Sequence, residues 1–204
     1  MAPDEDARLM LAFKEGDAAA FSALVERHRD GVVTYYWAMS RDRDFAEDLA
    51  QELFVKLFRH RVDYVPKASF RTYLFTLARN VWIDAYRSRR HRTPERSLDA
   101  TDEEGEGSLG ERLPGDAVRP EAGAERSELA EAIAKAVARL PADMREVFVL
   151  GAMQERDYAE VARTLDIPVG TVKSRMFHAV RRLRDLLSGV AQVAPQGREP
   201  RHES

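Results

Sequence analysis

The chain has 204 residues, no cysteine and a formal net charge of −3, and 44% of its residues are hydrophobic. Without cysteine it can form no disulfide, no thiolate metal site and no cysteine nucleophile. No stretch approaches the run of about 18 apolar residues that spans a bilayer. The opening residues, MAPDEDARLM, lack the basic and apolar segments of a signal peptide. We therefore expect a cytoplasmic protein that does not insert into a membrane.

The charges are unevenly distributed along the chain. Arginines and lysine dominate segments 71–92 and 171–187, each of which contains a single aspartate. The intervening segment 93–126 is acidic, rich in Gly, Pro and Ser, and without sustained apolar periodicity, so we predict a flexible linker. The nearly neutral total therefore conceals two basic segments on either side of an acidic one.

Apolar spacing in residues 1–92 predicts a first unit of three helices. The first helix follows Asp17, a suitable N-cap, and Gly31 is the candidate position for a break in it. The second helix covers 44–60, and the third begins near Ser69 and continues through 70–90. The expected core stripes of the second and third helices are Ala46, Leu49, Ala50, Leu53 and Leu57, and Phe70, Leu74, Leu77, Val81 and Ala85.

Residues 127–189 predict a second helical unit. Pro141 marks a helix start, and Asp157 and Glu160 have the spacing of a capping box. The turn DIPVG then joins this short helix to 171–187, which makes a helix-turn-helix. Its expected internal contacts are those of Tyr158, Val161, Ala162, Leu165 and Ile167 with Val172 and Met176. The prediction is an all-α fold of two small helical domains, 1–92 and 127–189, with linker 93–126 between them and a disordered tail, 190–204.

The helix 171–187 has two faces. An apolar stripe is expected at Val172, Met176, Val180, Leu183 and Leu187. At about 100° per residue the opposite face carries polar, basic and aromatic side chains that suit phosphates, base edges and thymine methyl groups. The candidate DNA contacts are Thr171, Lys173, Ser174, Arg175, Phe177, His178 and Arg181. The alternative is an ordinary basic helix in a bundle, but the complete two-helix pattern favours DNA binding.

The segments LPADMREVFVL, YAEVARTLDIP and GTVKSRMFHAVRRLR strongly resemble region 4 of bacterial sigma factors of the extracytoplasmic-function (ECF) class, in the sigma-70 family. The resemblance implies that the last helix enters the major groove at the promoter −35 element. By the same resemblance, the residues that contact the −35 element are Lys173, Ser174, Phe177 and His178. Family members often have Arg at the position of His178. Asp166 stands where many such motifs place Gly, and Asp tolerates the left-handed conformation.

Residues 46–59, AEDLAQELFVKLFR, resemble sigma region 2.2. The resemblance implies a surface for the clamp helices of core RNA polymerase. A mixed polar and aromatic helix face also suits a partner helix, although a helix buried on two sides is an open alternative. The candidate polymerase-binding residues are Asp48, Gln51, Glu52, Phe54, Val55 and Phe58.

Residues 68–92 resemble regions 2.3 and 2.4, which open and read the −10 element. Aromatic residues beside an arginine suit stacking of unpaired bases, but packing of Phe75, Trp82 and Tyr86 on a neighbouring helix is the favoured alternative. By resemblance, the preceding loop RVDYVPKA accepts a base flipped from the non-template strand. Pro66 and Tyr73 depart from the Gly and Trp that are common in relatives. The candidate −10 residues are Tyr64, Arg71, Arg79, Asn80, Asp84 and Arg87.

The sequence therefore predicts a sigma factor that binds core RNA polymerase through its clamp helices and flap, and directs it to promoter DNA. An anti-sigma factor is an expected partner, and by resemblance the linker runs through polymerase, although a solvated spacer is an alternative. No phosphate-binding glycine motif or H-E-x-x-H pair is present, so we expect no catalysis, cofactor or metal. Two alternatives stay open: a stand-alone helix-turn-helix regulator, and a sigma mimic that titrates an anti-sigma factor.

Overall fold

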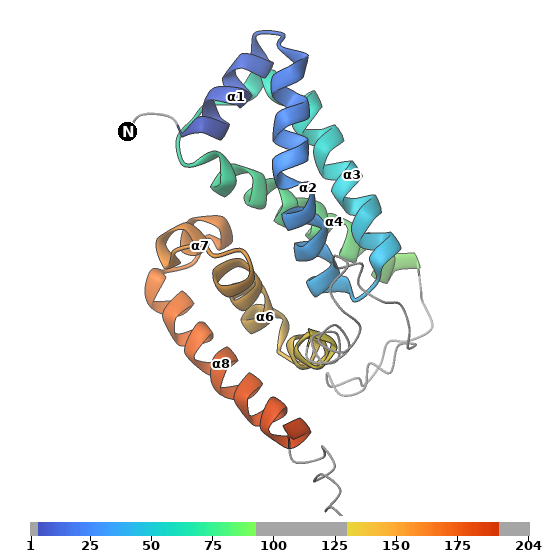
Figure 1. The fold of residues 1–204 in the computed structure, drawn as a ribbon, viewed down its shortest axis with the longest axis vertical. Coiled ribbons are helices and arrows are strands. Elements are labelled where there is room, and N and C mark those ends of the chain that lie inside the picture. Colours follow the sequence, from blue (N-terminus) through green and yellow to red (C-terminus); the bar gives the residue numbers. More distant parts are fainter. Residues whose placement is uncertain (1–3, 93–129, 192–204) are drawn as a thin grey trace, which may run out of the picture.

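The computed structural model describes residues 4–92 and 130–191, and every secondary-structure element in those ranges is a helix (Figure 1). The first unit contains α1 (Glu5–Lys14), α2 (Ala18–Ser40), α3 (Arg43–Arg59), the short η1 (Arg61–Asp63) and α4 (Phe70–Arg92). The second contains a helix over 130–138, α6 (Ala142–Phe148), η2 (Val149–Met153), α7 (Tyr158–Leu165) and α8 (Val169–Ala191). The predicted all-α fold with two helical units is confirmed, whereas the predicted linker and most of the predicted tail lie outside the described residues.

Aspartate N-caps determine where several helices begin. Asp4, Asp17, Asp42 and Asp157 accept hydrogen bonds from backbone N–H groups in the first turns of α1, α2, α3 and α7. Such bonds satisfy N–H groups that have no partner within the helix. The N-cap role predicted for Asp17 is therefore confirmed, whereas sequence periodicity did not predict α1 at all.

Helix α2 continues without interruption through Gly31, so the candidate break there is absent. The glycine has a packing role instead. The side-chain amide of Gln154, from the second unit, donates a hydrogen bond of 3.0 Å to the Gly31 carbonyl oxygen. A Cβ at position 31 would lie 3.0 Å from Gln154 Oε1, closer than most side chains tolerate. Gly31 therefore lets the second unit approach the α2 backbone.

The core of the first unit lies between α2, α3 and α4, with α1 at one end (Figure 1). The predicted α3 stripe is confirmed, because all five of its members are buried: Ala46, Leu49, Ala50, Leu53 and Leu57. On α4, Phe70, Leu74 and Val81 are also fully buried, whereas Leu77 and Ala85 are only partly buried. Ala78, which the predicted stripe omitted, is completely enclosed.

The second unit contains the predicted helix-turn-helix. Val161 and Leu165 of α7 are buried with Val172 and Met176 of α8, and Asp166 adopts the left-handed conformation, with φ 54°, in the turn between them. The predicted core role of Val180 is wrong: its side chain is 41% exposed. Ala179 is buried in its place, because position 180 lies about 60° around the helix from the centre of the buried stripe.

A π-helical segment, η2, joins α6 to the turn before α7. Such segments are rare and shift the direction of the side chains that follow them. Glu155, two residues later, has a positive φ of 51°. The residues on either side of it, Gln154 and Arg156, are 3% and 4% exposed and reach into the first unit. This irregular backbone therefore places two polar side chains at the junction between the units.

The two units share one core. Buried apolar residues from both form a single continuous cluster, in which α7 packs against α4 and η2 against α2. Figure 1 shows α6, α7 and α8 together on one side of α2 and α4. The predicted flexible linker carried no information about this arrangement. None of the described helices is long and apolar enough to cross a bilayer.

Helix α1 is tied to α2 through a small charged cluster. The Asp6 carboxylate pairs with Arg27 and accepts a 2.9 Å hydrogen bond from His28 Nε2. The His28 ring lies 5.4 Å from that of Phe70, centroid to centroid. Burial lowers the pKa of His28 below its ordinary value of 6.5, although Asp6 acts in the opposite direction.

We predict that this histidine makes the first unit less stable in acid. A group whose pKa is lower in the folded state contributes stability above its ordinary pKa, and that contribution is lost as the pH falls. The melting temperature should therefore decrease between pH 7.5 and pH 5.5. His28→Gln, which keeps a donor toward Asp6, should reduce this decrease, and an unchanged pH dependence in the variant would contradict the assignment. Differential scanning calorimetry at both pH values measures it.

Candidate nucleic-acid and polymerase interfaces

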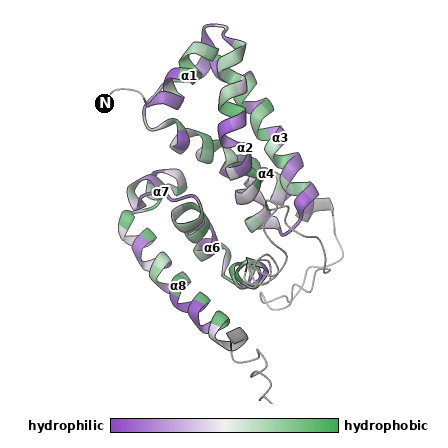
Figure 2. Ribbon diagram, in the orientation of Figure 1, coloured by the Kyte–Doolittle hydropathy of each residue, from purple (hydrophilic) through white to green (hydrophobic). Residues whose placement is uncertain are grey.

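The predicted −35 face of α8 is open to solvent. Lys173, Ser174, His178 and Arg181 are exposed, and Phe177 is 65% exposed, with its ring edge-on to that of His178 at 5.4 Å. Hydrophobic and hydrophilic residues alternate along α8 (Figure 2), as expected for an amphipathic helix with one side in the core. An aromatic ring at this exposure among basic side chains suits a surface that a partner covers.

Two further −35 candidates are less accessible. The Arg175 guanidinium forms an ion pair of 3.2 Å with Asp143 of α6, and Thr171 is partly buried in the first turn of α8. Next to this face, an open hollow of about 510 Å³ lies between α6 and α8. Its lining residues are Met144, His178, Arg181, Arg182, Asp185 and Leu186. The lining therefore combines the apolar side chains of Met144 and Leu186 with mainly basic polar side chains.

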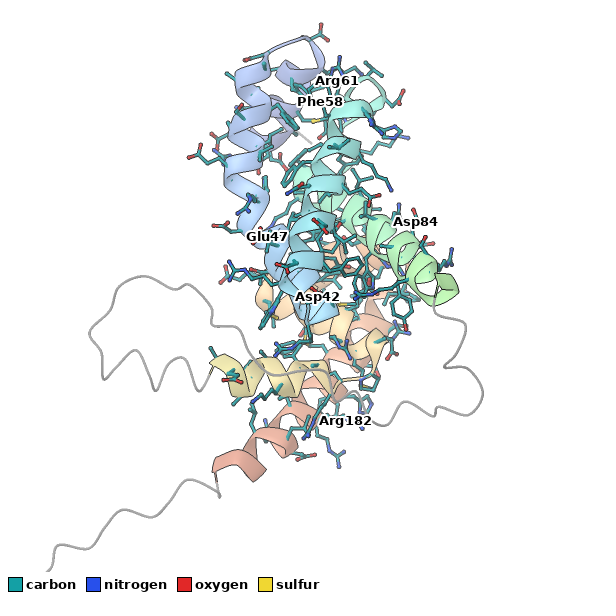
Figure 3. The ribbon with its side chains drawn as sticks, turned by 90° about the vertical axis from the view of Figure 1, so that its right-hand side faces the viewer. Asp42, Glu47, Phe58, Arg61, Asp84 and Arg182 are labelled. Carbon is teal, nitrogen blue, oxygen red and sulfur yellow. The ribbon has the colours of Figure 1, made fainter. Side chains whose placement is uncertain are left out.

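The predicted polymerase-binding surface lies on α3. Asp48, Gln51 and Glu52 are exposed, Val55 and Phe58 are each 46% exposed, but Phe54 is only 9% exposed and contributes to the core. Figure 3 shows Phe58 and Arg61 together near one end of α3, with Asp42 toward the other. The Arg61 guanidinium lies 4.9 Å from the centre of the Phe58 ring.

This apolar surface continues beyond α3. Val62 and Val65 are 57% and 58% exposed in the segment that follows. Sequence patterns did not select these residues, because a loop carries no periodicity. The only sequence signal is that the two valines lie close together in this short segment.

The −10 candidates of α4 fall into two groups. Asn80, Asp84 and Arg87 are exposed and follow one another at helical spacing, and Asp84 is marked in Figure 3. The Asp84 carboxylate lies 3.8 Å from Lys56 Nζ. Arg71 is partly buried, and its Nε atom is fully buried without a hydrogen-bond partner.

The aromatic residues near these candidates mostly pack inside the protein. Phe75 is 1% exposed and contacts Tyr35 at 5.7 Å between ring centres, so the packing alternative is correct for it. Trp82 lies beside Tyr86 at 5.8 Å, and Tyr86 is 55% exposed. Of these aromatic side chains, Tyr86 is therefore the one that an unpaired base could reach directly.

Tyr64, the predicted pocket residue, is enclosed. Its side chain is 2% exposed and lies between Phe70 and Tyr73, at 6.2 and 5.0 Å. Its hydroxyl group is buried with no hydrogen-bond partner, and burial raises the pKa of Tyr64 to about 12. In this conformation the Tyr64 ring forms the floor of the loop and is not part of its outer surface.

Arg79, another −10 candidate, is engaged by the second unit. Its Nε donates a 3.0 Å hydrogen bond to Glu146 of α6, whose carboxylate also accepts a 3.3 Å bond from the Tyr35 hydroxyl. Burial raises the pKa of Glu146, and the neighbouring Arg79 opposes that rise. Glu146 of the second unit therefore binds the guanidinium group of Arg79 in the first unit.

Arg156 links the units a second time. Its side chain has no exposed surface, and it donates hydrogen bonds to Thr164 Oγ1 at 2.9 Å and to Thr72 Oγ1 at 2.8 Å. Its Nε lies 3.6 Å from Glu160 Oε2. The capping box predicted for α7 is only half formed. Asp157 accepts from the Glu160 N–H, but the Glu160 carboxylate crosses to the other unit and accepts from Ser69 Oγ at 2.6 Å.

Comparisons with known proteins agree with this architecture. Residues 24–92 match the family described as Sigma-70 region 2, and residues 130–183 match Sigma-70, region 4. The ECF RNA polymerase sigma factor SigW of Bacillus subtilis is 32% identical over 175 residues, which cover 85% of this chain and 92% of SigW. The ECF RNA polymerase sigma-E factor of Escherichia coli is 29% identical, covering 85% of this chain and 90% of its own length.

Solved structures show the same fold. CnrH, in complex with the cytosolic domain of CnrY, has a TM-score of 0.67 and 26% identity, covering 91% of this chain and 99% of CnrH. The sigma factor RpoE of Bartonella quintana, in complex with the anti-sigma factor NepR, has a TM-score of 0.66 at 23% identity, covering 82% of this chain and 96% of RpoE. The fold defines an all-helical protein of two units with a helix-turn-helix in the second. The chain belongs to the ECF class of RNA polymerase sigma factors in the sigma-70 family.

We predict that Arg156 is the most sensitive polar residue at the junction. Arg156→Ala leaves Thr72, Thr164 and Glu160 without their shared partner in a buried site, so the free energy of unfolding should fall by about 3 kcal/mol. Arg163→Ala, on an exposed position of the same helix α7, is the matched control and should change it by less than about 0.5 kcal/mol. Urea denaturation followed by circular dichroism measures both. Equal losses in the two variants would contradict the role of Arg156.

Proposed function

We propose that this chain binds core RNA polymerase and directs it to promoters that contain −35 and −10 elements. The observation that carries this proposal is the solvent-exposed face of α8, with Lys173, Ser174, Phe177 and His178 on the second helix of a helix-turn-helix. Family membership supports it. This activity requires no catalysis by the chain and no cofactor or metal, and it takes place where promoter DNA lies, in the cytoplasm.

Each interface has a proposed role. The α3 surface around Val55 and Phe58 binds the clamp helices of polymerase, and the second unit binds the flap. The α8 face reads the −35 element, while α4 and the loop before it open and read the −10 element. The exposed α3 surface disfavours a stand-alone regulator, which needs no such surface. Exposed basic side chains in both units, such as Arg87 and Lys173, disfavour a mimic that only titrates a partner.

We further propose that an anti-sigma factor binds this chain, because the sigma factor RpoE, which shares its fold, forms a complex with the anti-sigma factor NepR. The junction between the units suggests what such a partner stabilises. Glu146 occupies Arg79 Nε, and the Arg79 side chain is only 29% exposed, so in this proposal the arginine reaches promoter DNA only once this contact is broken. Binding to a −10 element therefore requires the second unit to move away from α4, and an anti-sigma factor would favour the packed arrangement.

In vitro transcription with purified core polymerase and a library of promoters tests the main proposal. The expected result is a transcript that depends on this chain and on two sequence blocks shared by the active templates. Transcription from no template, with a core enzyme that is active with another sigma factor, would reject the proposal. Binding to DNA without core polymerase, as a dimer on two half-sites, would favour the stand-alone regulator.

We predict that Phe58→Asp weakens core polymerase binding by about tenfold or more, since a buried aromatic anchor contributes at least that much to a typical interface. Phe177→Asp introduces the same change at an exposed phenylalanine on the α8 face assigned to DNA, and should leave the affinity for core polymerase unchanged in the absence of DNA. Fluorescence anisotropy with labelled protein measures the affinities, and circular dichroism verifies folding. Equal affinities for Phe58→Asp and the parent chain would exclude this surface.

We predict that the −35 face binds DNA in two ways. Lys173→Ala should weaken binding to all promoters and give a shallower salt dependence, because it removes an ion pair between lysine and a phosphate. Ser174→Ala and His178→Ala should instead change the preferred −35 bases, by about 1–3 kcal/mol for each hydrogen bond to a base that is removed. Lys135→Ala, an exposed lysine outside this face, is the control. If all four variants select the same templates equally well from the library, α8 is not the reading helix.

A further inference from the structure

Helix α1 and its N-cap Asp4 precede the segment that matches Sigma-70 region 2, yet they form hydrogen bonds with the middle of the loop that follows α3, at Tyr64, and with its end, at Phe70. We propose that α1 fixes the conformation of this loop, residues 60–69, and thereby determines which −10 base the loop accepts and how readily the strands open. The inference rests on the proposed function of the loop in promoter opening. It assigns to Asp4 and Lys14 the role of positioning residues.

The first contact ties the start of α4 to the start of α1. One oxygen of the Asp4 carboxylate accepts a 2.6 Å hydrogen bond from the Ala7 N–H and so caps α1. The other oxygen accepts a 3.0 Å bond from the Phe70 N–H, at the first residue of α4. Because the first N–H groups of a helix have no partner within it, this bond helps to fix where α4 begins, together with the Ser69 hydroxyl, which accepts a 3.2 Å bond from the Thr72 N–H.

The second contact ties the middle of the loop, at Tyr64, to the last turn of α1. Lys14 Nζ donates a 3.1 Å hydrogen bond to the carbonyl oxygen of Tyr64. Beside it, the Phe13 ring lies 5.3 Å from the Phe58 ring and 5.6 Å from the Arg61 guanidinium, which is in η1. The residues at the exit from α3 are therefore packed against α1.

These contacts lie at opposite ends of a short rigid element. A helix of ten residues is about 15 Å long, so α1 sets the positions of the Tyr64 carbonyl and the Phe70 N–H relative to each other. Helix α1 is itself immobilised, since Met10 is completely buried and Asp6 pairs with Arg27 and His28 of α2. A change in the loop therefore requires either a break in one of these bonds or a shift of the whole helix.

The loop has little other support of its own. Its backbone hydrogen bonds are local, such as Tyr64 N–H to the Arg61 carbonyl and Lys67 N–H to the Val65 carbonyl. Its remaining tertiary hydrogen bond in the described structure joins Ser69 to Glu160 of the second unit. When the units separate on promoter binding, that bond breaks, and the bonds from α1 remain. The Tyr64 ring would stay between Phe70 and Tyr73 of α4, while the Tyr64 backbone would be held by its bond to Lys14 of α1.

The test compares Asp4→Ala and Lys14→Ala with Asp17→Ala in the full chain. Asp17 is also an aspartate N-cap, of α2, so its replacement removes the same charge and the same kind of capping bond but no bond to the loop. Lys14→Arg restores a cationic donor near Tyr64. Hydrogen–deuterium exchange of peptides covering 60–70 reports the loop directly. Permanganate footprinting and base preference at each −10 position are measured with core polymerase, on duplex and pre-melted templates.

The expected result is that Asp4→Ala and Lys14→Ala increase exchange in 60–70 and reduce duplex opening by about fivefold, the equivalent of one hydrogen bond. They should also alter the preferred base at one −10 position, with unchanged core binding. Lys14→Arg should behave like the parent chain, and Asp17→Ala should show none of these effects even if its melting temperature falls equally. A shift in base preference is the decisive readout, because general destabilisation does not produce it.

Two results would overturn the inference. One is unchanged exchange in 60–70 for both variants. The other is faster exchange with opening and base preference equal to those of Asp17→Ala, which would reduce α1 to a stabilising element. Both leave the proposed function intact, provided that the parent chain opens promoters. Failure of the parent chain to open any template with active core polymerase would instead reject the proposed function, and the inference with it.

Discussion

The arrangement of the two units depends on the burial of one guanidinium group. Arg156 has no exposed side-chain surface, and transferring such a charge out of water costs several kcal/mol unless it is paired and hydrogen-bonded. Here the cost is offset by two threonine hydroxyl groups, by Glu160, and by the ring of Phe75, whose centre lies 5.5 Å from the guanidinium carbon. Because Thr72 and Phe75 belong to α4, this compensation exists only while the units are packed together. When the units separate, the Arg156 guanidinium is exposed to water, which solvates its charge in place of the lost partners. A buried charge of this kind specifies one arrangement without making it irreversible.

The sequence predicted the local structure well and the junction not at all. The α3 stripe, the helix-turn-helix and the N-cap at Asp17 follow from periodicity and capping, and these depend on residues close together in the chain. The α1 helix was not predicted, although Asp4 followed by acidic residues is a capping signal, because its apolar residues follow one another from Leu9 to Phe13 and so give weak periodicity. Glu146, Arg156 and Glu160 resemble ordinary surface charges in the sequence. Only the tertiary packing buries them.

The candidate sites show the same contrast between features that depend on local sequence and features that depend on tertiary packing. The exposed face of α8 could be predicted because a helix has a fixed angular repeat, and one buried side defines the other. Val180 was misplaced because it lies at the edge of the stripe, where a smaller neighbour packs better. For Tyr64, Phe54 and Arg79, residue type suggested a surface role, whereas their accessibility depends on α4, the core and α6, respectively. Loop residues have no periodicity from which burial could be inferred.

The contact between Arg79 and Glu146 has a consequence for affinity. Glu146 occupies Arg79 Nε, a donor that a phosphate or a base edge could otherwise use, so under the proposed function the second unit would act as an internal competitor for nucleic acid. Because the competitor is part of the same chain, its effective concentration is of the order of millimolar and does not decrease on dilution. The apparent dissociation constant of the isolated chain for −10 DNA is then the intrinsic constant divided by the fraction of molecules that are open. Under the proposed function, a polymerase that holds the units apart would increase that fraction toward one and so strengthen promoter binding, even with no new contact between this chain and the DNA.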